Sequence, residues 1–144
     1  MDGNVELLNY VYQNSEMGTE TIEHLLEIVD DSNFKKCLES QYQEYAKINK
    51  AAIELIHQHG KEEKDISKAQ EWMSSMMISM KTMMDKSPCH IAEMMMQGSV
   101  MGIINATKNL NKYQAADKKV VKLMDDLLAM EERNLKELKQ FLKE

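Results

Sequence analysis

A carboxylate and an imidazole three residues apart on a helix share one face and can bind one metal ion. The sequence contains one such Glu-x-x-His pair, Glu54 with His57, and one related pair, Glu131 with Asn134. Glu54 and His57 lie opposite the apolar stripe of their helix, whereas Glu131 and Asn134 lie on the stripe of theirs. We therefore expect Glu131, and not Glu54, to face the protein interior.

Methionine is the second residue type that could do chemistry, because thioethers bind soft ions such as Cu(I). Ten of the 14 methionines lie between Met73 and Met101, and Met73, Met76 and Met80 follow helical spacing. The same spacing is typical of the core-facing stripe of an amphipathic helix, which favours packing over metal binding. An exposed methionine stripe could also bind a partner protein. For residues 73–84 the sequence leaves core, interface and soft-metal site open.

Composition excludes several other functions. No histidine is placed with a nucleophile and an orienting acid, and no glycine-rich phosphate loop is present, so an enzyme is not favoured. The net charge of -6, with basic residues scattered among acids, argues against nucleic-acid binding. Apolar runs are too short to span a membrane. Two distant cysteines, Cys37 and Cys89, are typical of a reduced compartment. We expect a cytoplasmic protein.

The elements that position these residues are helices. One proline and five glycines among 144 residues leave few turns, so we expect one all-α domain spanning residues 1–144. Short breaks, including Ser87-Pro88, make neighbouring helices antiparallel, with one helix crossing the bundle over residues 67–85. The result is the ferritin-like arrangement of four-helix bundles. The four bundle helices are expected at residues 4–30, 34–59, 88–112 and 115–142.

The third bundle helix differs from the others because it is apolar on nearly every side between Ile91 and Ala106. This pattern predicts burial from several directions. Gly98 and Gly102, one turn apart, predict that another helix approaches closely there. Gly18 of the first helix is a candidate for that contact.

The stretch AEMMMQGSVMGIINATKNLNKY, followed by EERNLKELKQFL, resembles the last two helices of small bacterial proteins in the ferritin-like superfamily, in a family of unknown function. The resemblance implies a possible di-iron centre. Its pattern is one Glu on each of two helices and Glu-x-x-His on each of the other two. Here Glu131-x-x-Asn134 takes the place of one Glu-x-x-His.

Because only one of the four expected carboxylates clearly faces inward, and no histidine does, we expect that the di-metal site has been lost. A buried Glu131 then needs hydrogen-bonding partners. We expect a polar core layer made of Ser15, Gln41, Tyr45, Asn49, Asn105, Glu131 and Asn134.

The sequence thus favours a non-enzymatic helical bundle without cofactor that acts through protein association, as a homodimer or with a partner on the methionine-rich helix. The alternative is an iron protein for iron or peroxide handling. Its metal ligands would be Glu131, Asn134, Glu44 and Glu93.

Overall fold

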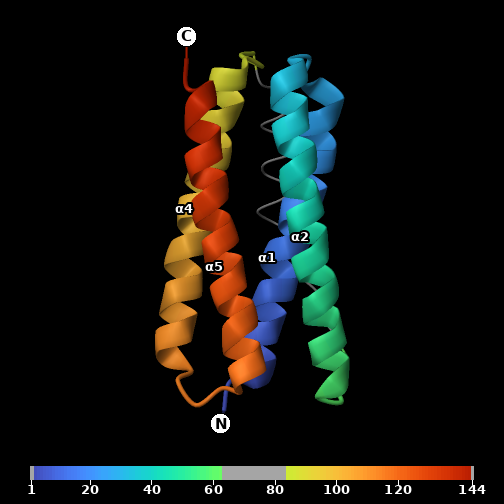
Figure 1. The fold of residues 1–144 in the computed structure, drawn as a ribbon, viewed down its shortest axis with the longest axis vertical. Coiled ribbons are helices and arrows are strands. Elements are labelled where there is room, and N and C mark those ends of the chain that lie inside the picture. The colour runs from blue at the N-terminus through green and yellow to red at the C-terminus, as the bar shows by residue number, and fades with distance from the viewer. Residues whose placement is uncertain (1, 63–83, 144) are drawn as a thin grey trace.

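The computed structural model describes residues 2–62 and 84–143 of the chain. They form an all-α four-helix bundle, and no strand occurs among them (Figure 1). This confirms the predicted fold class. The elements are α1 (Asn4–Ile28), α2 (Ser32–Gln58), α4 (Pro88–Lys112), α5 (Lys118–Leu138) and a short 3-10 turn, η1 (Lys139–Phe141).

Side chains cap the starts of two helices. The Asp31 side chain accepts a hydrogen bond from the backbone N–H of Phe34 at 2.8 Å, at the start of α2. The Ser87 hydroxyl accepts one from the backbone N–H of His90 at 3.3 Å, and Pro88 takes the first position of α4. These caps satisfy N–H groups that have no partner within the helix.

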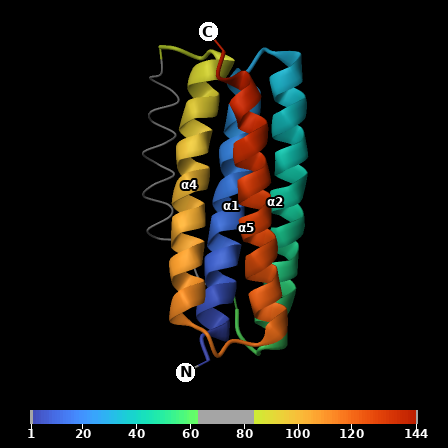
Figure 2. The same cartoon turned by 60° about the vertical axis from the view of Figure 1, so that its left-hand side comes forward.

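The order of helix directions is also as expected. Figures 1 and 2 show that α1 and α2 form one antiparallel pair and that α4 and α5 form another, while α2 and α4 run in the same direction. The chain between Gln58 and Pro88 therefore joins opposite ends of the bundle. Most of the expected crossover helix, and the methionine stripe of residues 73–84 apart from Met84, lie outside the described residues. Met84 itself lies in a bend and is exposed.

The core lies between the four helices, and α4 contributes least to it. Its buried apolar residues are Ile91, Ala92 and Ala106. The expectation of burial on several sides was wrong, because Val100, Met101 and Ile104 are 42%, 56% and 47% exposed.

None of the described helices is long and apolar enough to cross a membrane. The largest fully buried side chains are Phe34, Leu7, Leu8, Ile22, Leu25, Leu38, Ile56, Ile91, Met124, Leu127, Met130 and Leu138.

Candidate functional site

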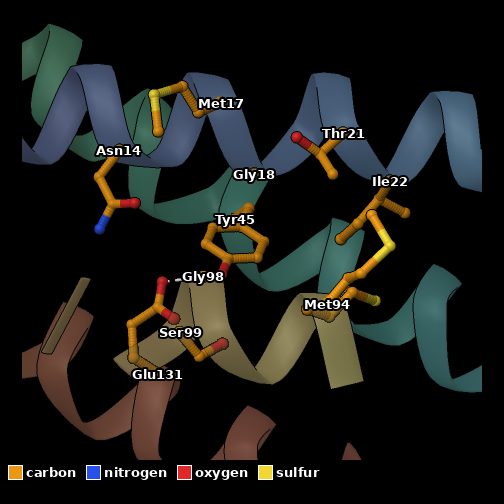
Figure 3. A pocket seen from close by; sticks show the side chains of 11 residues that line it. Asn14, Met17, Gly18, Thr21, Ile22, Tyr45, Met94, Gly98, Ser99 and Glu131 are labelled. Carbon is orange, nitrogen blue, oxygen red and sulfur yellow. Dashed lines mark hydrogen bonds between the residues drawn. The ribbon is translucent and has the colours of Figure 1, made fainter. Parts of the chain in front are cut away.

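The candidate site is centred on Glu131 of α5, whose side chain is only 2% exposed. Its Oε1 atom accepts a hydrogen bond of 2.7 Å from the hydroxyl of Tyr45 on α2 (Figure 3). Its other oxygen, Oε2, has no hydrogen-bond partner among the described residues. The carboxyl group is therefore anchored at one oxygen by a group from another helix.

A glycine on α1 makes room for this contact. A Cβ atom added to Gly18 would lie 2.6 Å from the Tyr45 ring, which is closer than real side chains approach. Gly18 therefore meets Tyr45, and not the glycines of α4 as the sequence suggested. The absence of a side chain at Gly18 lets Tyr45 reach Glu131 across the bundle.

The two glycines of α4 have different surroundings. A Cβ atom at Gly102 would lie 3.4 Å from Asn14 Nδ2 and 3.6 Å from Glu131 Cδ, so helix packing is close there. A Cβ atom at Gly98 would meet no atom of the described residues within 4 Å. Among the described residues, close packing is thus found at Gly102 and not at Gly98, which lines a cavity.

Burial controls the electrostatics of the site. Loss of hydration raises the pKa of Glu131 from 4.5 to about 7, against the opposing effect of the Tyr45 and Ser99 hydroxyls. Burial, together with the negative charge of Glu131, also raises the pKa values of Tyr45 and Tyr10 well above 10. The Tyr10 hydroxyl donates a 2.9 Å hydrogen bond to the backbone oxygen of Gly102. Near neutral pH, Glu131 can therefore hold or release a proton.

Glu131 lines a cavity of about 60 Å³, which has room for several water molecules. Figure 3 shows side chains from α1, α2, α4 and α5 around it. Asn14 of α1 adds a second buried polar atom, its Nδ2, that has no hydrogen-bond partner in the described part of the chain. Most of the other lining is apolar and includes Met17, Ile22 and Met94.

The remaining residues of the expected polar layer form separate local groups. Asn49 of α2 donates to Ser15 Oγ at 3.1 Å, and Ser15 donates to the backbone oxygen of Val11 at 2.7 Å. Gln41 donates to the Cys37 sulfur at 3.5 Å, within α2. These contacts satisfy polar groups near the α1–α2 pair but do not reach Glu131.

Two further members of the expected layer lie outside these local groups. Asn134 is fully buried on α5, and neither atom of its amide group has a hydrogen-bond partner among the described residues. Asn105 is exposed, so its assignment to the buried layer was wrong. The reason is the rotation of α4, whose inward face is centred on Ser99, Gly102 and Ala106, roughly 100° from Asn105.

Sequence reasoning missed Ser99 and Asn14. Ser99 lies seven residues after Ala92 and seven before Ala106, and all three are buried. Small residues at this spacing mark one side of a helix, so the pattern could have located the inward face of α4. The position of Asn14 has no comparable signal, because it depends on how α1 and α4 are placed against each other.

Glu131 and Asn134 are both buried on α5, but the three glutamates expected for an iron site, Glu131, Glu44 and Glu93, do not form one group. Glu93 is exposed on the outer side of α4, whereas Glu131 is buried. Glu44 is partly buried and pairs with Arg133 at 3.8 Å; burial raises its pKa, and Arg133 opposes the rise. Among the described residues no group of three or more His, Cys, Asp or Glu side chains could hold a metal ion. This donor set does not fit a di-iron centre.

A second feature lies on the outside of the α4–α5 pair. The exposed apolar residues of α4 line a groove of about 470 Å³. Leu135 and Leu142 form its other wall, and the charged groups along it are Glu93 and Lys139. The α4–α5 groove, as we call it, is lined by Glu93, Met96, Gln97, Val100, Met101, Ile104, Leu135, Lys139 and Leu142.

Comparison of the chain with protein-family models, with curated proteins and with solved structures finds no match. The resemblance to the ferritin-like superfamily therefore stays a prediction from the sequence, and the fold that is established is the all-α four-helix bundle.

Proposed function

We propose that this chain is a non-enzymatic bundle of the ferritin-like type that has lost its di-metal site and acts through protein association. The observation that carries the proposal is the α4–α5 groove. Val100, Met101 and Ile104 are each more than 40% exposed in the middle of a long helix. Contiguous apolar surface of this kind favours association, because burying it releases about 25 cal/mol per Å².

The proposed partner is a second copy of the chain. An apolar groove bordered by polar residues suits an interface whose centre excludes water and whose rim stays hydrated.

The two cysteines, Cys37 and Cys89, form no disulfide, which supports a reduced compartment such as the cytoplasm.

The interior of the bundle supports the proposed loss of the di-metal site. Among the described residues, Glu131 is the only one that brings a carboxyl group to the inner cavity, and its pKa of about 7 leaves it partly uncharged at neutral pH. One carboxyl group with one tyrosine hydroxyl offers neither the charge nor the ligand number of a di-iron centre. Iron bound in stoichiometric amount after purification without chelators would contradict this part of the proposal.

Solution mass tests the association. Ile104→Glu places a charge in the α4–α5 groove and should convert a dimer into a monomer. Asn105→Glu is the matched control, because it adds the same charge at the next position, which is exposed and outside the groove. We expect the wild type and Asn105→Glu to have the mass of a dimer. Equal masses for the two variants would contradict the use of this groove.

A further inference from the structure

The side chains on the outward face of α4 form a pattern that matches a second copy of the same face running in the opposite direction. The exposed side chains of Val100, Met101 and Ile104 form its apolar centre. An exposed acid, Glu93, lies toward the N-terminal end of this face, and an exposed base, Lys108, lies toward its C-terminal end. At about 100° per residue these side chains, together with Gln97, fall within an arc of roughly 100°. Neither Glu93 nor Lys108 forms an ion pair with another described residue.

The midpoint of this face lies between Val100 and Met101. Glu93 and Lys108 lie equally far from it, each about 11 Å along the helix at 1.5 Å per residue. If two copies of α4 pack antiparallel about this point, Glu93 of each copy lies opposite Lys108 of the other. Gln97 lies opposite Ile104, and Val100 meets Met101 at the centre. Two-fold symmetry therefore forms the charge pair twice.

A parallel arrangement would have the opposite effect. It would place Glu93 against Glu93 and Lys108 against Lys108, and like charges facing each other weaken association. The charges of this face thus distinguish between the two arrangements, whereas its apolar centre fits both. The groove also offers the incoming helix a second wall, in which Leu135 of α5 and Leu142, which follows η1, are apolar and Lys139 is charged.

We propose that two copies of this chain associate through α4, antiparallel and centred between Val100 and Met101, with Glu93 of each copy opposite Lys108 of the other. This proposal rests on the proposed association through the α4–α5 groove and adds its partner orientation and register.

Charge reversal tests the pairing. Glu93→Lys and Lys108→Glu, made separately, each place like charges at both ends of the contact. Each should raise the dimer dissociation constant by about tenfold or more, since every change acts twice. An equimolar mixture of the two variants should form a heterodimer of near wild-type affinity, because the altered chains are complementary. The double variant in one chain should recover the homodimer for the same reason.

Sedimentation equilibrium measures these constants. Glu54→Lys is the control, because it makes the same reversal at an exposed position on α2 outside the groove, and it should leave the constant unchanged. Two results would overturn the pairing but leave the groove in place as an interface. In the first, the wild type is a dimer and the single reversals do not change its dissociation constant. In the second, the single reversals weaken the dimer, and neither the mixture nor the double variant restores it. A wild type that is a monomer at every concentration would overturn both proposals.

Discussion

The two faces of α4 depart from the usual distribution of polar and apolar residues in opposite ways. Its inner face, at Ser99 and Gly102, borders the buried carboxyl group of Glu131 and a cavity. Its outer face exposes Val100 and Ile104. The inner departure is compensated within the chain, because Tyr45 donates a hydrogen bond to Glu131. No described residue covers the outer face, where Val100 and Ile104 stay exposed, and we infer that a second chain covers it.

The difference explains why the two faces should respond to different experiments. Changes at the inner face should alter the free energy of unfolding, because a buried carboxyl group without partners is costly. Changes at the outer face should alter association and leave the fold unchanged. Unfolding and association, measured separately, therefore distinguish the two faces.

The largest effect is the pH dependence of stability due to Glu131. Its pKa is about 7 in the folded chain against an ordinary 4.5. Below pH 4.5 the group is protonated in both states, and its contribution to stability is fully present. As the pH rises to 7, the unfolded chain releases its proton first, so stability falls by about 3 kcal/mol and then levels off.

Denaturant unfolding of the wild type and of Glu131→Gln between pH 4 and pH 8 checks this. The difference between the two proteins isolates Glu131 from other titrating groups, such as Glu44, whose pKa is also raised. A difference that stays constant across this range would mean that the carboxyl group is hydrated in the folded protein.

The next largest effect is expected at Gly18, with Gly98 for comparison. Gly18→Ala places a Cβ atom against the Tyr45 ring and should destabilise the fold by about 1–3 kcal/mol. Gly98→Ala is the matched control, because its Cβ atom would lie more than 4 Å from every neighbouring atom in the described part of the chain. It should stabilise the helix by about 0.5–1 kcal/mol. Thermal unfolding measures both, and a shift of the same sign in the two variants would show that Tyr45 is not held as described.

Removing one hydroxyl should have a smaller effect. Tyr45→Phe removes the hydrogen bond to Glu131 and should reduce the free energy of unfolding by about 1–2 kcal/mol. Tyr42→Phe removes a hydrogen bond to Glu23 on the surface, where water can replace it, and should have almost no effect. Chemical denaturation compares the two. Equal losses would mean that the Tyr45 hydroxyl gains nothing from burial.

The smallest effect is expected at the outer face. Ile104→Ser should change the stability of the isolated monomer by less than about 0.5 kcal/mol, because the side chain is already 47% exposed. Unfolding measured in dilute solution, below the range of association, checks this. A loss above about 1 kcal/mol would indicate that residues of the same chain pack against this face.

The sequence predicts the fold better than the site for a physical reason. Asp31 and Ser87 fix two helix starts through local hydrogen bonds, so the elements and their directions follow from short-range signals. On α5 the polar and apolar residues alternate at helical period, so Glu131 and Asn134 are placed on the buried side. On α4 apolar residues occur on every side, so the period does not define one face. Asn105 was therefore misplaced.

The partner of Glu131 could not be read from the sequence. It depends on which turns of α2 and α5 lie at the same level, and on the space that Gly18 leaves for the Tyr45 ring. Both are properties of the assembled bundle.

We infer that another copy of the chain covers the outer face of α4. The most direct test is the solution mass of the full-length wild-type protein, measured by sedimentation equilibrium over a wide range of concentrations. We expect a monomer–dimer equilibrium that moves to the dimer as concentration rises. A mass equal to that of one chain at every concentration would contradict it.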